Sequence, residues 1–217
     1  EPYRRQRQMC IRDRLCTVFF SCSDSNNFRQ EPDTTIPLEE DKTNPSLIVN
    51  GDMEDDISMD LSTIAVSGVW SYIGGWNAKA AIVEQKENSG VNNSRCLAII
   101  ALDEDTDVMF AQKVTGLKSG GYYKASAKVK TDMIDGGMGA NLCLDYLWAP
   151  TSGALTGSHS KWQDLVLEID DVPENGEIIL CLRLGNTAAA SRGLAYFDDV
   201  VLKAVSYTHL TLPTIRL

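Results

Sequence analysis

From residue 44 onward, the chain repeats short segments in which apolar and polar residues alternate. The clearest segments are 96–102, 107–114, 122–131, 140–148, 161–169, 177–185 and 195–202. Alternation with a period of two is typical of half-buried strands, and Gly, Asn, Asp, Ser and Pro fill the gaps. No long window has the periodicity of an amphipathic helix. Because the gaps are too short for crossover helices, the pattern predicts an all-β, antiparallel β-sandwich or jelly roll over residues 44–204.

Residues 1–14 and 205–217 are related to each other at the level of DNA. One allowed choice of codons for EPYRRQRQMCIRDR has a reverse complement that encodes VSYTHLTLPTIRL, the sequence of 205–217. Both segments resemble a translated sequencing adapter, so they are excluded from the fold prediction. A basic nucleic-acid-binding arm, the alternative, does not account for the antisense relation. We therefore expect the natural protein to extend beyond both ends of this sequence.

The charge of the remaining chain argues against a nucleic-acid partner. The full sequence has 20 basic and 30 acidic residues. The two adapter-like segments hold six of the basic and two of the acidic ones, which leaves 14 and 28, a net charge of −14. Such a chain repels phosphate backbones, so we expect no nucleic-acid binding.

Three cysteines, Cys96, Cys143 and Cys181, fall within residues 44–204. Their spacing is not that of metal ligands, so a zinc site is not expected. We expect all three cysteines to be small buried apolar residues. A disulfide between Cys143 and Cys181 is the alternative if the compartment is oxidising.

The segment before the predicted domain indicates export. Residues 15–22 have an apolar run followed by Phe19-Phe20-Ser21-Cys22, which resembles a truncated bacterial lipoprotein signal with Cys22 as the lipidated residue. A short buried strand is the alternative. Residues 23–43 are polar with two prolines and predict a flexible tether. We therefore expect a protein on the outer surface of the bacterial cell envelope, held to the membrane only through lipid at Cys22.

Several ordered motifs resemble carbohydrate-binding modules of families 4, 9 and 22. NPSLIVNGDME at 44–54 is similar to their opening strand, although Met53 replaces the usual Phe. The resemblance continues through Gly75-Trp76, VTGLKSGGYYKASAKVKT at 114–131, Trp162 and YFDDVVL at 196–202. It implies a galactose-binding-like jelly roll that binds a polysaccharide or oligosaccharide. A fold hosts many functions, so a structural or adhesive spacer is the alternative.

Alternation also suggests which side chains face away from the core. If the strands share one sheet, Lys128, Asp145 and Arg183 line a polar cleft whose donors and acceptors match sugar hydroxyls. An ion pair between Asp145 and Arg183 is the simpler alternative. Aromatic rings near loops or strand ends could stack on sugars, although a tryptophan in a sandwich is more often a core residue, as we expect for Trp162. The candidate rings are Trp70, Tyr72, Trp76 and Trp148.

The resemblance also implies structural calcium between the first and last strands. The matching positions are Glu54 and Asp198, with Asp52 nearby, and these carboxylates are the hard oxygen ligands that Ca²⁺ prefers. Strand capping by Asp198 is the alternative.

No catalytic constellation is recognisable. His159 is the only histidine outside the adapter-like segments, and no glycine-rich phosphate loop opens a helix. We expect this domain to be non-catalytic. Such modules commonly precede glycoside hydrolase domains, so whether the parent protein is a hydrolase stays open.

Overall fold

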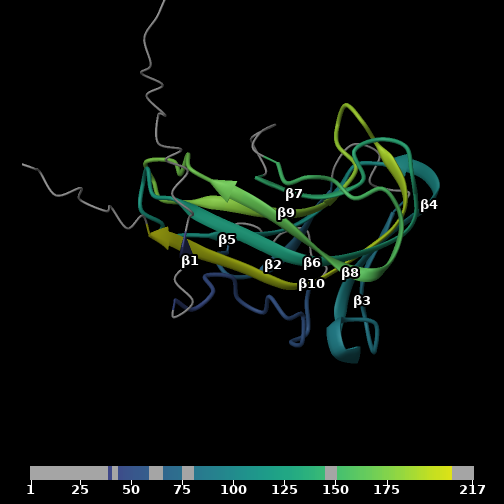
Figure 1. The fold of residues 1–217 in the computed structure, drawn as a ribbon, viewed down its shortest axis with the longest axis horizontal. Coiled ribbons are helices and arrows are strands. Elements are labelled where there is room, and N and C mark those ends of the chain that lie inside the picture. Colours follow the sequence, from purple (N-terminus) through teal and green to yellow (C-terminus); the bar gives the residue numbers. More distant parts are fainter. Residues whose placement is uncertain (1–38, 41–43, 59–65, 75–80, 145–150, 207–217) are drawn as a thin grey trace, which may run out of the picture. The chain divides into compact units, whose positions relative to one another are not determined.

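The computed structural model describes residues 39–40, 44–58, 66–74, 81–144 and 151–206. Strands make up nearly all of its regular structure, with one short 3-10 turn (Figure 1). No helix within these ranges is long and apolar enough to span a membrane. The elements are β1 (Glu39–Glu40), β2 (Trp70–Gly74), β3 (Ile82–Lys86), η3 (Val91–Asn93), β4 (Cys96–Thr106), β5 (Val108–Val114), β6 (Tyr123–Asp135), β7 (Ala140–Leu144), β8 (Gly157–Ile169), β9 (Ile178–Leu184) and β10 (Ser191–Ser206).

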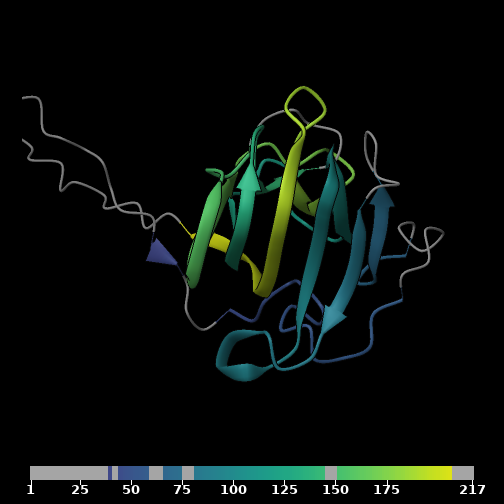
Figure 2. The same cartoon turned by 90° about the vertical axis from the view of Figure 1, so that its right-hand side faces the viewer.

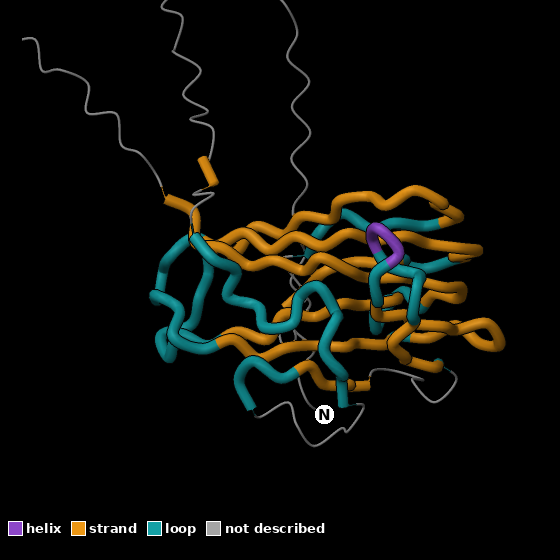
Figure 3. The backbone as a smooth tube through the Cα atoms, turned by 90° about the horizontal axis from the view of Figure 1, so that it is seen from below, coloured by secondary structure: helices purple, strands orange, loops and turns teal. Residues whose placement is uncertain are grey.

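The strands form two antiparallel sheets. The large sheet has the order β3-β4-β10-β6-β8, with β1 paired to β10 outside this path. The small sheet has the order β2-β5-β9-β7. Figure 2 shows the strands of the large sheet side by side, and Figure 3 shows the sheets as two layers. The predicted all-β antiparallel sandwich is confirmed.

Consecutive strands alternate between the two sheets from β4 to β10. Strands β4, β6, β8 and β10 belong to the large sheet, whereas β5, β7 and β9 belong to the small sheet. Each connection therefore crosses from one layer to the other, as in a jelly roll. Two strands that follow each other in the sequence therefore lie in different layers, and their outward side chains are on opposite faces of the sandwich.

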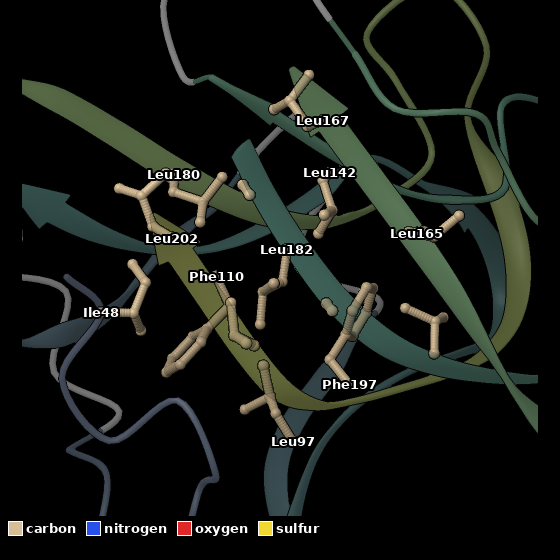
Figure 4. Close-up of a cluster of buried hydrophobic side chains, with 14 of the residues drawn as sticks. Ile48, Leu97, Phe110, Leu142, Leu165, Leu167, Leu180, Leu182, Phe197 and Leu202 are labelled. Carbon is tan, nitrogen blue, oxygen red and sulfur yellow. The ribbon is translucent and has the colours of Figure 1, made fainter. Parts of the chain in front are cut away.

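One hydrophobic core fills the space between the sheets (Figure 4). Phe197 and Leu97 from the large sheet and Phe110 and Leu182 from the small sheet have no exposed surface. The inward sets predicted from alternation are confirmed. They are Tyr123, Ala125, Ala127 and Val129 of β6, Leu142 and Leu144 of β7, and Ile178, Leu180, Leu182 and Leu184 of β9.

The opening strand expected at 44–54 is not formed, because this segment bonds to side chains and single backbone groups instead of a ladder. Val49 donates its N–H to the Gln112 side-chain oxygen at 2.9 Å and accepts from the Gln112 amide nitrogen at 2.8 Å. Asn50 has φ 50°, which is not a strand conformation. The carbonyl of Gly51 accepts the Val200 N–H at 2.7 Å, and a side chain at 51 would collide with the Val200 carbonyl. This close approach explains the glycine of the Asn-Gly motif.

Strand β10 continues two residues past the expected end of the domain at 204. Val205 and Ser206, which belong to the adapter-like segment, pair with Glu40 and Glu39 of β1. The Val205 N–H also donates to the Tyr122 carbonyl at 2.9 Å. The sequence pattern missed β1, and it also missed β2 and β3, whose short segments do not alternate clearly.

Candidate functional site

The predicted polar cleft is not formed, because its members lie on different sheets. Lys128 is in β6 of the large sheet, whereas Arg183 is in β9 of the small sheet. Asp145 lies outside the described residues. Alternation correctly placed both described side chains away from the core, but it could not tell which layer each strand joins.

Arg183 forms a buried ion pair on the outer face of the small sheet. Its Nε and Nη2 donate to the two carboxylate oxygens of Asp107 at 2.6 and 2.7 Å, and Thr187 bonds to the same carboxylate at 3.1 Å. The two side chains are only 7% and 1% exposed. Burial lowers the pKa of Arg183, but the hydrogen bonds and charge of Asp107 and Cys143 together raise it by more, so the guanidinium stays charged. This satisfied, enclosed pair offers little to a ligand.

The middle of this face holds small, enclosed side chains. Ala111, Cys143 and Cys181 have no exposed surface and form a second apolar cluster with Met109 and Ile179 at its edge. Hydrogen bonding from Cys181, together with the Arg183 guanidinium, lowers the pKa of Cys143.

The two cysteines Cys143 and Cys181 are directly opposite in the register of β7 and β9, and no disulfide joins them. The backbone N–H and carbonyl of Leu142 form hydrogen bonds with Ser152, on the side of β7 away from β9. The backbone N–H and carbonyl of the next residue, Cys143, therefore point toward β9. Cα atoms at such hydrogen-bonded positions lie roughly 5.5 Å apart, which is within the range that disulfides span. The bridge that the sequence left open is not formed here, although the strand register allows it.

The structure contradicts the prediction that Trp70 is an exposed platform for a sugar. Its ring is 3% exposed and stacks on Phe110 in the core, with centroids 5.8 Å apart. The indole N–H donates to the Asn50 carbonyl at 3.0 Å, so even its polar atom is used internally. Trp76 and Trp148 lie outside the described residues. Only the backbone of Tyr72 is described, in β2.

An accessible group of aromatic and charged side chains lies instead on the outer face of the large sheet. Lys130 Nζ of β6 is 5.0 Å from the centroid of the Trp162 ring in β8 and 4.9 Å from that of Tyr196 in β10. Both rings are half-buried. The expectation that Trp162 belongs to the core is wrong, since its ring packs against a lysine on the solvent side.

A second pair extends this group along β6. Lys128 Nζ lies 2.7 Å from Asp164 Oδ1 of β8, and the two side chains are 38% and 64% exposed. We call Lys128, Lys130, Trp162, Asp164 and Tyr196 the aromatic face. It combines ring surfaces, ammonium donors and a carboxylate acceptor on adjacent rigid strands, which is the chemistry of recognition rather than of bond cleavage.

The register explains why these residues meet. Tyr196 is the Cα partner of Lys130, and Asp198 is the partner of Lys128. Tyr196 and Lys130 flank the buried residues Phe197 and Val129, so they point outward together. The alternation of YYKASAKVKT placed Lys130 on this side, but only the pairing of β6 with β8 and β10 brings the two rings to it.

A shallow groove of about 460 Å³ lies at the end of the same sheet. It is lined by Leu102, Met133, Ile134, Asp135, Arg192 and Gly193. Leu102 and Met133 are 49% and 59% exposed, and Arg192 Nη2 is 3.6 Å from Asp135. The groove therefore combines apolar surface with a loosely held arginine.

The predicted calcium ligands do not form a site. Asp52, Glu54 and Asp198 belong to no group of three or more metal-capable side chains among the described residues. The Asp198 carboxylate already accepts from the Val91 N–H at 2.7 Å, the Ser94 hydroxyl and the Asp199 N–H.

Glu54 is likewise occupied, and a cation is already present beside it. Its Oε1 accepts the Arg95 N–H at 2.8 Å, and its carbonyl accepts from the Arg95 guanidinium at 2.7 Å. Arg95 also pairs with Asp56 and Glu87. An arginine thus supplies positive charge beside Glu54, and its carboxylate partners Asp56 and Glu87 are not among the predicted calcium ligands.

Comparisons with known proteins establish the fold. No protein-family model and no curated protein sequence matches the chain. A "putative sugar binding protein" from Bacteroides thetaiotaomicron is similar with a TM-score of 0.54 at 13% identity, over 73% of this chain and 99% of that one. The enzymatically active domain of tailspike protein 4 of bacteriophage CBA120 is similar with a TM-score of 0.50 at 11% identity, over 73% of this chain and 21% of that one. TmCBM61, solved with β-1,4-galactotriose, is similar with a TM-score of 0.49 at 15% identity, over 74% of this chain and 99% of that one. At these identities the first two matches show a shared fold.

Proposed function

We propose that this domain is a non-catalytic carbohydrate-binding module of an exported, lipid-anchored cell-envelope protein, and that its glycan lies on the aromatic face. The observation that carries the proposal is Lys130, which lies about equally far from the half-buried rings of Trp162 and Tyr196 on the outside of a sheet.

The chemistry of the aromatic face suits a sugar. Ring faces cover the apolar C–H side of a pyranose, while charged groups exchange hydrogen bonds with its hydroxyls. Lys128 and Asp164 provide a donor and an acceptor beside the rings. All five side chains are carried on strands, so little ordering is needed when a ligand binds.

The fold gives weaker support. The similarity to a "putative sugar binding protein" agrees with glycan binding, but a jelly roll hosts many functions. The aromatic face therefore carries the proposed function.

The test is calorimetric titration of the complete 217-residue chain with a panel of soluble polysaccharides. Trp162→Ala should weaken binding by at least tenfold, because a sugar loses its stacking surface. Tyr122→Ala is the matched control, since Tyr122 is 44% exposed but lies outside the aromatic face. Unfolding temperatures verify that both variants are folded.

Two results would contradict the proposal. Binding that survives Trp162→Ala and Tyr196→Ala would move the glycan to another surface. A folded chain that binds no member of the panel would favour a structural or adhesive spacer.

The lipid anchor is proposed from the sequence, and Cys22 lies outside the described residues. Mass spectrometry of the natural protein from envelope fractions should find an acylated Cys22 as the first residue. A mature chain that retains residues before Cys22 would exclude this anchor.

A further inference from the structure

We infer that the preferred ligand of the aromatic face is an acidic polysaccharide, whose negatively charged groups bind the Lys130 ammonium. This inference rests on the proposed function, and it names the class of glycan that the site would select.

Lys130 differs from the other lysines around it in having no carboxylate partner among the described residues. Its contacts are the rings of Trp162 and Tyr196 and the Ser89 carbonyl, 3.3 Å from Nζ. An ammonium group has three donors, so two are left for a ligand. The rings attract the cation but leave its charge uncompensated.

The neighbouring lysines each lie next to a carboxylate. Lys128 pairs with Asp164 at 2.7 Å, and Lys86 pairs with Glu84 at 3.0 Å. Lys124 is opposite Glu168 in the register of β6 and β8. The row that contains Tyr196 and Lys130 continues through Ala98 of β4 to Glu84 of β3. Glu84 is paired with Lys86, so among the described residues no carboxylate forms an ion pair with the Lys130 ammonium.

The groove provides a second cation on β10, the strand that carries Tyr196. Arg192 precedes Tyr196 by four residues on β10, roughly 13 Å in an extended strand. Its ion pair with Asp135 is long, 3.6 Å, and the two side chains are 47% and 81% exposed, so a ligand can replace this partner at little cost. A chain lying along β10 would meet Lys130 first and then Arg192.

The net charge of −14 does not exclude such a ligand. Charges farther apart than about 10 Å are largely screened at moderate ionic strength, so the contacts near Lys130 dominate. Duplex DNA has one charge for roughly every 1.7 Å, whereas a polyuronate has a single carboxylate on each sugar unit. The acidic surroundings should thus reject a dense polyanion and tolerate a sparse one.

The experiment compares acidic polysaccharides with neutral partners of the same backbone. The full chain is titrated with polygalacturonate and its fully methyl-esterified form, with dextran sulfate and dextran, and with duplex DNA as a dense polyanion. We expect at least tenfold tighter binding to one acidic member than to its neutral partner, with affinity falling as NaCl is raised. The uronate and sulfate pairs distinguish the two kinds of anion.

Variants connect this preference to Lys130. Lys130→Met should reduce the acidic-to-neutral preference at least tenfold, and Lys130→Arg should retain most of it. Lys118→Met, at an exposed turn position, is the control.

The outcomes separate the inference from the proposed function. Equal binding of the neutral partners, or a preference unchanged in Lys130→Met, would overturn the inference while the proposed function stands. Equally tight binding of DNA would also overturn it, because the site would then be a general polyanion surface. Failure to bind any glycan of the wider panel would overturn both.

Discussion

Two ion pairs, one on the outer face of each sheet, have opposite surroundings. Arg183 and Asp107 on the small sheet are 7% and 1% exposed and are joined by two hydrogen bonds. Lys128 and Asp164 on the large sheet are 38% and 64% exposed and are joined by one contact. Similar chemistry is thus enclosed on one face and presented to solvent on the other.

The difference in exposure of the two ion pairs indicates which face is available to a ligand. A buried pair is fixed, because removing one partner leaves an uncompensated charge away from water. An exposed pair contributes little to folding and can exchange its partner for a ligand. We therefore assign stability to the face of Arg183 and recognition to the face of Lys130.

The largest expected effect is on the buried pair. Asp107→Asn should lower the free energy of unfolding by about 3–5 kcal/mol, because Arg183 loses its counter-charge. Denaturant unfolding measures this change.

A double variant, Asp107→Leu with Arg183→Met, serves as the control for that measurement. It should recover much of the stability, since no buried charge is left. A loss below 1 kcal/mol in Asp107→Asn would show that the pair is not enclosed in solution.

The cysteines extend the comparison to reactivity. Burial, followed by the Asp198 charge, raises the pKa of Cys96 on the large sheet to about 11, whereas the pKa of Cys143 on the small sheet is lowered. Alkylation at pH 8, followed residue by residue with mass spectrometry, should be about a hundredfold slower at Cys96 than in the unfolded chain. A half-maximal rate at Cys96 at lower pH than at Cys143 would contradict the assignment.

Asp198 gives a smaller effect that depends on pH. Burial raises its pKa above the usual value near 3.8, even though the hydrogen bonds from Val91, Asp199 and Ser94 oppose the shift. The folded state then holds this proton more tightly than the unfolded state, so stability falls as the pH rises through the unfolded and then the folded pKa. Unfolding of the native chain and of Asp198→Asn between pH 3 and 7 should show this loss in the native chain only. An opposite slope would mean that the hydrogen bonds outweigh burial.

The smallest expected effect is on the exposed pair. Asp164→Asn should change the free energy of unfolding by about 1 kcal/mol or less, because water screens this ion pair. A loss comparable to that of Asp107→Asn would remove the contrast between the faces. Thermal unfolding of Asp164→Asn and Asp107→Asn in one buffer measures both changes.

Much of the fold followed from the sequence, but the site did not. The inward sets of β6, β7 and β9 were read correctly, because burial of one strand face imposes alternation whatever the neighbouring strand is. The aromatic face was missed, since Trp162, Lys130 and Tyr196 are far apart in the chain and meet only through strand pairing. Trp70 was placed outside because no local pattern reveals that its ring stacks on Phe110.

The sequence by itself determined that residues after 44 form an antiparallel β-sandwich and which side of most strands is buried. Those properties depend on the local period of apolar residues. Only the tertiary structure decided which strands share a sheet. It therefore decided that Lys128 and Arg183 lie on separate sheets, that Asp107 neutralises Arg183, and that Arg95 lies beside Glu54. Strand order depends on long-range pairing and loop crossings, which alternation along one strand does not encode.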